Sequence, residues 1–356
     1  MAIVISARLT RFAALALLGA LFGPVFGPFL GPAPAHAETA IHFTLDRKID
    51  GPAAPFFLAI DKGYFKDEGL DVTIDATTGG PLEAISRLAA GKDDMGVSDV
   101  NLLIKFRDAT NTPIKAVFVV FDKPPYAIIA RKSRGVVTPR DLEGRKLGAP
   151  AADPTFAQWP IFAKVNGIDA TKVAIEDVGF PVREPMLAAG EVDAITGFSF
   201  TCYVDLKDHG VPPDDLALLL MADYGVELYG DAIMVSPVFA QEKPEAVRAF
   251  LRAYVRALKD AMRDPPRAVE AVLHRAEGFS KDVELERLRM AIRDNIVTPA
   301  VKASGFGGIE SARFAAAIDQ IALAYRFKAK DKAAAAFDPS FLPPAAERQV
   351  SESASR

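Results

Sequence analysis

Residues 114–131, IKAVFVVFDKPPYAIIAR, decide how the rest of the sequence divides. Residues 114–121 form a nearly continuous apolar run of β-branched and aromatic side chains, which is typical of a buried strand. Lys123-Pro124-Pro125 interrupts this run, and residues 126–131 begin a second apolar strand. One series of alternating strands and helices therefore ends near residue 122, and a second series begins just after it.

The same alternation extends in both directions from this stretch. Strands are predicted at 41–45, 70–74, 95–97, 145–148, 173–178, 193–196, 216–221 and 231–236, with a helix at about 154–165. Strands separated by helices in this rhythm predict βαβ units and a largely parallel sheet. Ser236-Pro237 is typical of a helix start, and the chain beyond it is expected to be almost entirely helical to about residue 328.

This order of elements predicts an α/β protein with two lobes. The first lobe is expected to contain residues 38–122 and 230–344, and the second lobe residues 123–229 with the hinge. The chain then crosses between the lobes twice, and such a double crossing is a hinge because few residues absorb the rotation. Residues 345–356 are polar and are expected to form a disordered tail.

The first residues carry the pattern of an export signal. Arg8 and Arg11 give a basic start, residues 13–22 are apolar, and Ala35-His36-Ala37 is an A-x-A ending. We therefore predict a signal peptide at residues 1–37. A membrane anchor is the alternative, but glycines and prolines from position 23 onward break the run before the ~20 apolar residues of a membrane span. The mature protein is expected to be exported, and to be periplasmic if the source is Gram-negative.

Composition indicates an ordinary globular protein. Half of the 356 residues are hydrophobic and the net charge is -4, so no clustered basic face predicts a nucleic-acid partner. Cys202 is the only cysteine, which excludes an internal disulfide, and the four histidines lack metal-ligand spacing. The sequence contains no G-x-S-x-G, Walker A, H-E-x-x-H or early G-x-G-x-x-G motif. We therefore expect no enzymatic activity, no metal and no cofactor.

Three further stretches resemble a known family. They are FLAIDKGYFKDEGLDV at 57–72, PRDLEGRKLG at 139–148 and LAAGEVDA at 187–194. Together and in this order they resemble the substrate-binding proteins of ABC importers for nitrate, sulfonate, taurine and thiamine-pyrimidine precursors. The resemblance extends over most of the mature chain.

The resemblance implies a type II periplasmic-binding-protein fold with the ligand between the lobes. It also implies an ABC permease in the inner membrane as partner, and we expect a monomer. The family includes a pyrimidine-synthase branch with a Cys-rich motif, which is absent here because Cys202 stands alone. A periplasmic enzyme or sensor domain on the same fold, such as a pyrimidine-synthase-like protein, is the alternative.

In an open parallel sheet, ligands bind beyond the carboxyl ends of the strands. The first candidate loop contains Thr78, Gly79 and Gly80, where two glycines let the backbone approach a ligand and the next helix offers unpaired N–H groups. A sulfonate, a carboxylate or another acceptor would fit there. A plain glycine-rich turn that caps the helix is the alternative.

Carboxylates follow two other strands of the first lobe. Asp46 follows the first strand, and Ser98-Asp99 follows the strand at 95–97. These side chains are candidates for hydrogen bonds to a ligand, although Ser98 and Asp99 could simply cap the next helix. Asp46 and Asp99 argue against a small bare anion, because a carboxylate in the cleft repels one.

Aromatic and hydroxyl side chains mark the second lobe and the second crossing. The candidates for ligand contact are Thr155, Phe156, Trp159, Phe198, Ser199 and Tyr229. Capping alone explains Asp153, and core packing is the more frequent use of a residue such as Trp159. Arg183-Glu184 could line the cleft or be merely solvated, and solvation is favoured. We expect these aromatics to hold a planar ring, and hence a pyrimidine or aromatic precursor slightly more than an aliphatic sulfonate.

Overall fold

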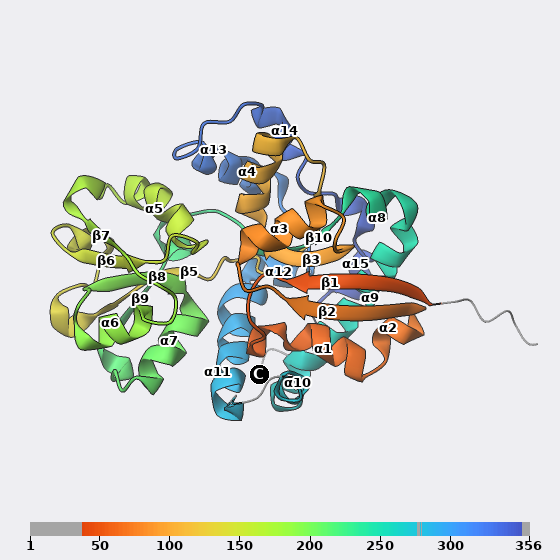
Figure 1. Cartoon of the computed structure of the whole chain (residues 1–356), viewed down its shortest axis with the longest axis horizontal. Coiled ribbons are helices and arrows are strands. Elements are labelled where there is room, and N and C mark those ends of the chain that lie inside the picture. Colours follow the sequence, from red (N-terminus) through yellow and green to blue (C-terminus); the bar gives the residue numbers. More distant parts are fainter. Residues whose placement is uncertain (1–37, 276–277, 279, 351–356) are drawn as a thin grey trace, which may run out of the picture. The chain divides into compact units, whose positions relative to one another are not determined.

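The computed structural model describes residues 38–275, 278 and 280–350. The expected signal peptide, residues 1–37, lies outside them. Within the described part of the chain, no helix is long and apolar enough to cross a membrane. Two five-stranded sheets with helices packed on them give the expected two-lobed α/β architecture (Figure 1).

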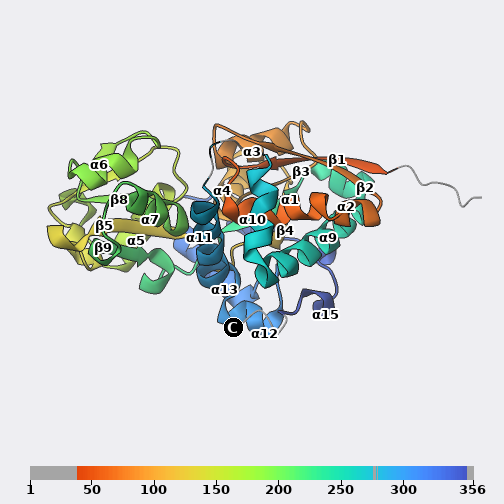
Figure 2. The ribbon, with the colours of Figure 1, turned by 90° about the horizontal axis from the view of Figure 1, so that it is seen from below.

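The first sheet has the strand order β2-β1-β3-β10-β4. Its strands are β1 (Thr39–Leu45), β2 (Leu70–Ala76), β3 (Met95–Asp99), β4 (Lys115–Val119) and β10 (Asp231–Val235). Helices α3 (Pro81–Ala89) and α4 (Val100–Thr110) lie on one side of it, and α1 (Ala54–Asp61) and α9 (Pro244–Arg263) lie on the other (Figures 1 and 2). The other helices of this lobe are α2 (Tyr64–Asp67), α8 (Pro237–Glu242), α10 (Pro265–Leu273), α11 (Lys281–Ala291), α12 (Pro299–Ser304), α13 (Ser311–Ile321), α14 (Lys330–Ala334) and α15 (Ala345–Arg348).

The second sheet repeats this arrangement in the order β7-β6-β8-β5-β9. Its strands are β5 (Tyr126–Arg131), β6 (Lys146–Ala149), β7 (Ala174–Asp177), β8 (Ala194–Phe198) and β9 (Leu216–Leu220). Helix α5 (Trp159–Val165) packs on one face, and α6 (Arg183–Ala189) and α7 (Ser199–Asp208) pack on the other. The helix expected at 154–165 is shorter, because a 3₁₀ turn (Phe156–Gln158) precedes α5.

Both sheets are mixed, so the expectation of a largely parallel sheet is wrong for one strand in each lobe. In the first lobe β10 runs antiparallel to β3 and β4, and in the second lobe β5 runs antiparallel to β8 and β9. The cause is the double crossing. Each crossing segment enters its sheet at the end where the parallel strands finish. The strand that it begins, β10 or β5, therefore runs in the opposite direction to them.

The two crossing segments are hydrogen-bonded to each other. The Val120 N–H donates to the Asp231 carbonyl (2.8 Å), and the Gly230 N–H donates to the Phe121 carbonyl (2.9 Å). The chain therefore passes between the sheets as a short paired ribbon. This pairing places Asp231, the first residue of β10, beside the carboxyl end of β3, where it is aligned with Asp99.

An aromatic cluster joins α9 to the first sheet. Phe250 stacks on Phe43 with ring centroids 5.1 Å apart and on Phe65 at 4.7 Å, and Tyr254 contacts Phe56 at 4.5 Å. Phe250 and Tyr254 are four residues apart, so they share one face of the helix. Burying each such ring contributes about 1.5–3 kcal/mol. The C-terminal helices are thus part of the core of the first lobe.

Residues 345–350 are folded, so the expected disordered tail is wrong for this part. The Arg348 carbonyl accepts a hydrogen bond from the Phe306 N–H (2.9 Å), and Arg348 Nη1 donates to the Phe306 carbonyl (2.6 Å). Polar composition alone does not reveal such a contact between distant segments. Residues 351–356 lie outside the described residues.

Candidate functional site

A cleft of about 410 Å³ lies where the strands of both sheets end. Both lobes contribute to it, mostly with segments that follow strands or begin helices, and also with Asp205 within α7 and Arg287 within α11 (Lys281–Ala291). The residues of the first lobe are Asp46, Arg47, Lys48, Ile49, Asp50, Thr77, Thr78, Gly80, Pro81 and Arg287. The residues of the second lobe are Asp153, Pro154, Phe180, Pro181, Arg183, Glu184, Phe198, Thr201 and Asp205.

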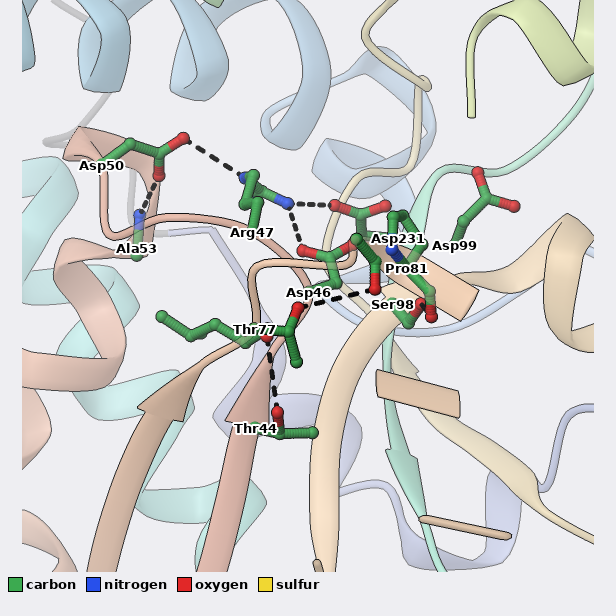
Figure 3. Close-up of polar contacts among 12 residues, drawn as sticks. Thr44, Asp46, Arg47, Asp50, Ala53, Thr77, Pro81, Ser98, Asp99 and Asp231 are labelled. Carbon is green, nitrogen blue, oxygen red and sulfur yellow. Dashed lines mark hydrogen bonds and ion pairs between the residues drawn. The ribbon is translucent and has the colours of Figure 1, made fainter. Parts of the chain in front are cut away.

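Arg47 is the centre of the first-lobe wall (Figure 3). Its Nη1 donates to Asp46 Oδ1 and to Asp231 Oδ2, both at 2.7 Å, and its Nε donates to Asp50 Oδ2 at 3.2 Å. The guanidinium carbon lies 5.5 Å from the ring centroid of Phe198. Because Phe198 ends β8, this contact joins the charged cluster to the second lobe.

Carboxylates outnumber cations in this cluster. Burial and the neighbouring carboxylate of Asp231 raise the pKa of Asp46 well above its ordinary value, and burial raises the pKa of Asp231. Burial lowers the pKa of Arg47, but the surrounding carboxylates raise it more, so the guanidinium stays charged. Asp46 Oδ2 and Asp231 Oδ1 are buried and accept no hydrogen bond from any described residue. Of these two oxygens, only Oδ2 of Asp46 belongs to a residue that lines the cleft.

Asp99 lies behind this wall. Its Oδ1 accepts a hydrogen bond from the Leu102 N–H at 2.7 Å, which caps α4, and its Oδ2 accepts one from the Tyr126 hydroxyl. Burial, followed by the Asp231 carboxylate, raises the pKa of Asp99 to about 6. The expected capping role of Asp99 is thus present. Tyr126 begins β5, so Asp99 also links the two lobes.

The second-lobe wall contains a buried ion pair. Arg183 donates to Glu184 Oε1 from Nε (2.9 Å) and from Nη2 (2.5 Å), while its Nη1 lies 3.8 Å from Asp153 Oδ2. Arg183 and Glu184 are 5% and 4% exposed, so the favoured sequence interpretation of a solvated pair is wrong. The Arg183 guanidinium lies 5.5 Å from the ring centroid of Phe180, which is 47% exposed at the cleft.

Four of the predicted site residues line the cleft, namely Asp46, Thr78, Gly80 and Phe198. Gly80 has φ +80°, a conformation that favours glycine, and it precedes α3. Gly79 is not among the lining residues. Its N–H donates to Glu83 Oε2 at 2.6 Å, so a carboxylate already occupies this helix start. An anionic ligand is therefore less favoured at this loop than the sequence indicated.

Other predicted residues serve the folded core. Ser98 is fully buried and donates to the Pro81 carbonyl (2.9 Å), and Phe156 packs against the core. Thr155 and Ser199 are buried, with hydroxyls that have no hydrogen-bond partner among the described residues. Trp159 is 5% exposed and contacts Phe162, so it has the core role.

Tyr229 is also used elsewhere. It is 1% exposed, its hydroxyl accepts the Glu310 N–H at 2.9 Å, and the Arg313 guanidinium lies 4.0 Å from its ring centroid. Tyr229 therefore stabilises the second crossing and does not line the cleft. Cys202 is fully buried, and burial raises the pKa of its thiol, so it packs as an apolar residue.

Sequence reasoning missed the residues that need distant partners. Arg47 directly follows Asp46, which was a usable signal, but Asp231 lies 184 residues further along the chain. Asp153 combines the expected capping contact to the Thr155 N–H (2.9 Å) with a place in the cleft. Within the described ranges, no group of histidine, cysteine and acidic residues could hold a metal ion.

Comparison with known proteins identifies binding proteins and enzymes as relatives. The chain is 26% identical over 223 residues to the riboflavin-binding protein RibY of Chloroflexus aurantiacus, and the aligned region covers 62% of each chain. It is 27% identical over 219 residues to a formylaminopyrimidine-binding protein of Halalkalibacterium halodurans, which covers 61% of this chain and 64% of that one. A 4-amino-5-hydroxymethyl-2-methylpyrimidine phosphate synthase of Aspergillus parasiticus is 26% identical, over 61% of this chain and 65% of the enzyme. The chain thus matches less than two thirds of the length of each of these relatives.

Solved structures show the fold. The periplasmic aliphatic sulphonate-binding protein SsuA of Escherichia coli has a TM-score of 0.64 at 13% identity, and covers 80% of this chain and 91% of its own. The nitrate-binding protein NrtA of Synechocystis has a TM-score of 0.60 at 14% identity, and covers 90% and 92%. The two lobes therefore form the periplasmic-binding-protein fold.

The family model described as NMT1/THI5 like matches residues 52–268, which is more than half of the chain. This match covers most of both sheets, including the loop at 77–81 and the loop at 180–184. The expected likeness to binding proteins for thiamine-pyrimidine precursors is confirmed at the level of the family. The chain belongs to the NMT1/THI5-like family.

Proposed function

We propose that this protein binds a small organic solute between its two lobes in the periplasm and delivers it to an ABC permease. Three observations support the proposal. They are the binding-protein fold, the cleft with residues from both lobes, and the relatives named as binding proteins for formylaminopyrimidine and riboflavin. The protein acts as a monomer, without a nucleic-acid partner, after removal of residues 1–37.

The preferred solute is a planar nitrogen heterocycle that carries hydrogen-bond donors. The observation that carries this proposal is the surplus of acceptors around Arg47, above all the unpaired Oδ2 of Asp46. An amino group or a protonated ring nitrogen placed there would give a partner to a buried oxygen, and a buried polar group without a partner costs about 1–3 kcal/mol. Phe198 and Phe180 add aromatic faces at the cleft for the ring.

Small anions are disfavoured as solutes by the same wall. A sulfonate or nitrate near Arg47 would meet the carboxylates of Asp46 and Asp50, and the N–H of Gly79 is already bonded to Glu83. Like charges in a partly buried site repel strongly. The ligands named for the structural neighbours therefore do not carry over to this chain.

We also propose that the protein has no enzymatic activity. The relatives that are named as pyrimidine phosphate synthases make this a point to test. The Cys-rich motif that the sequence resemblance assigns to that branch is absent, and Cys202 is buried in the core of the second lobe. Because such a synthase forms the pyrimidine, mass spectrometry of the purified protein should detect no pyrimidine phosphate formed, and an added aminopyrimidine should be returned unchanged.

Calorimetric titration of the chain without residues 1–37 tests the solute class. The protein is first unfolded and refolded to remove any carried solute, and the panel holds a formylaminopyrimidine, riboflavin, taurine and nitrate. We expect saturable binding of at least one heterocycle and none of taurine or nitrate. Binding of taurine or nitrate alone would contradict the proposed solute class, and silence of the whole panel would contradict the binding function for these compounds.

A further inference from the structure

Helix α11 contributes to the cleft from outside the residues that match the family. The family match ends at residue 268, whereas α11 spans Lys281–Ala291 and places Arg287 in the lining of the cleft. Arg287 is bonded through Nη2 to Asp205 on α7 of the second lobe, and through Nη1 to Glu284 on its own helix. The side chain of Arg287 is only 15% exposed.

A second ion pair joins the same two helices. Lys207 Nζ on α7 lies 2.5 Å and 2.8 Å from the two carboxylate oxygens of Glu286 on α11. These two side chains are 30% and 37% exposed and are not among the lining residues of the cleft. Helices α7 and α11 lie side by side in both views (Figures 1 and 2).

Helix α11 is fixed to the first lobe. Glu284 Oε2 accepts the Gly51 N–H at 2.6 Å, and Gly51 approaches α11 so closely that a Cβ there would lie 2.0 Å from the Glu284 carbonyl oxygen. Gly51 follows Asp50, which binds Arg47. Direct contacts therefore run from the solute-facing Arg47 to α11.

Helix α7 is fixed to the second lobe instead. Cys202 and Leu206 of α7 are fully buried in one cluster with Ile129 of β5 and Ile195 of β8. A rotation of one lobe against the other must therefore change the distance between α7 and α11. The two ion pairs between these helices must lengthen in such a rotation, and they therefore oppose it.

We propose that the pairs Arg287–Asp205 and Lys207–Glu286 form an interlobe latch that holds the cleft walls together and thereby sets the affinity for solute. The latch rests on the proposed function. It assigns control of the solute affinity to helix α11, which lies beyond the residues that match the family. The latch stabilises the conformer whose walls face each other, and that conformer is the one that binds solute. Weakening the latch reduces the population that is competent to bind.

Charge reversal of the outer pair tests the latch without touching the cleft. The variants are Lys207→Glu, Glu286→Lys and the double exchange, in which the pair is restored with opposite polarity. Each single reversal should raise the Kd for the heterocycle that binds best about two- to fivefold, as expected for a partly exposed ion pair. The double exchange should return the Kd to within about twofold of the parent value.

A distance measurement in the absence of solute separates the latch from the proposed function. Spin labels at Lys92→Cys in the first lobe and Ala174→Cys in the second lobe, both exposed positions, report the separation of the lobes, and the buried Cys202 is protected from labelling. Each single reversal should broaden the distance distribution by pulsed electron resonance, and the double exchange should narrow it again. If no solute binds the parent protein, the proposed function fails, while these distances still decide the latch.

An ion pair inside the first lobe provides the matched control. Arg252 Nη2 lies 2.6 Å from Glu68 Oε2, with side chains 35% and 19% exposed. Arg252→Glu should leave the interlobe distances and the Kd unchanged. Unchanged distances in both single reversals of the outer pair, or a double exchange that fails to restore them, would overturn the latch. Circular dichroism confirms that each variant is folded.

Discussion

At the scale of single residues, a substitution of Asp46 should affect solute binding and the free energy of unfolding differently. Its Oδ2 is an unpaired buried acceptor, and its pKa is raised by burial and by Asp231. Asp46→Asn should weaken binding of the heterocyclic solute about tenfold, because an amide nitrogen in place of Oδ2 cannot accept the solute's hydrogen bond, and a buried donor without a partner costs about 1–3 kcal/mol. The free energy of unfolding at pH 7 should not fall, since the variant removes a carboxylate that burial disfavours.

Calorimetry and urea denaturation measure the two effects of Asp46→Asn. Asp75→Asn, at an exposed position of β2, is the control that also removes one negative charge. It should leave both the Kd and the free energy of unfolding unchanged. Equal binding by Asp46→Asn and the parent protein would show that the solute does not use this acceptor.

Asp99 predicts a pH dependence of stability. Its pKa is about 6 in the folded protein against an ordinary 3.8, and this difference corresponds to about 3 kcal/mol. Because the folded pKa is the higher one, the folded protein binds the proton more tightly than the unfolded chain does. Stability is therefore lost as the pH rises from about 4 to 6, and the loss is complete above pH 6.

Asp99→Asn should remove this loss. Asparagine caps a helix as well as aspartate and still offers an oxygen to the Leu102 N–H, so α4 keeps its cap. Free energies of unfolding from urea titrations between pH 4 and 7 should rise for the variant relative to the parent protein, by up to about 3 kcal/mol. Asp141→Asn is the control, because the backbone N–H groups of Val137 and Thr138 lower the pKa of Asp141. Its free energy of unfolding should therefore fall relative to that of the parent protein as the pH rises. Parallel curves for Asp99→Asn and the parent would show that Asp99 ionises without cost.

Single residues were the hardest to predict from sequence. Asp46 and Phe198 could be placed at the cleft because they lie at the ends of strands, and that rule needs only local patterns. Arg47 could not, because its role depends on Asp231, which a second crossing of the chain brings back to the first sheet. Trp159 shows the opposite error, since a ring that follows a loop can turn into the core as easily as into the cleft.

At the scale of elements, Gly51 fixes the contact between the turn before α1 and helix α11. A Cβ at residue 51 would lie 2.0 Å from the Glu284 carbonyl oxygen, so Gly51→Ala must displace backbone. We expect a loss of about 1–3 kcal/mol in the free energy of unfolding, which is typical of overpacking, measured by urea denaturation. The affinity for solute should fall as well, because α11 carries Arg287.

Gly308→Ala is the control for this substitution. A Cβ at Gly308 would meet its nearest atoms at 3.7 Å, which is ordinary contact. Its stability should change by less than about 1 kcal/mol. A Gly51→Ala variant as stable as Gly308→Ala would mean that α11 can shift away at no cost, and would weaken the argument that α11 moves with the first lobe.

Strands were predictable because their patterns are local. Residues 126–131 and 70–74 were expected as strands, and the observed strands are Tyr126–Arg131 and Leu70–Ala76. The direction of a strand within its sheet is not local, and for this reason the antiparallel β5 and β10 were missed. The folded segment at 345–350 was missed for the same reason, because its partner is Phe306.

At the scale of the whole molecule, the two sheets share one strand order, and the chain links them twice. Similarity to solved binding proteins extends over 80% and 90% of the chain, whereas the family model ends at residue 268. The fold is therefore common to proteins named for different ligands, and it does not by itself select the solute. For this reason the fold could be predicted from the sequence stretches that resemble the family, whereas the proposed solute class depends on the contacts of Arg47.

Solute binding should stabilise the whole molecule while leaving its tryptophan almost unchanged. Trp159 is buried against Phe162 and does not line the cleft, so its emission should change little on titration. A solute at 100 times its Kd should add about 2.7 kcal/mol to the free energy of unfolding and raise the melting temperature. Phe180→Trp places a second indole at the exposed edge of the cleft, where its emission should respond strongly to the same solute. A large response of Trp159 in the parent protein would instead place the solute, or a movement of α5, inside the second lobe.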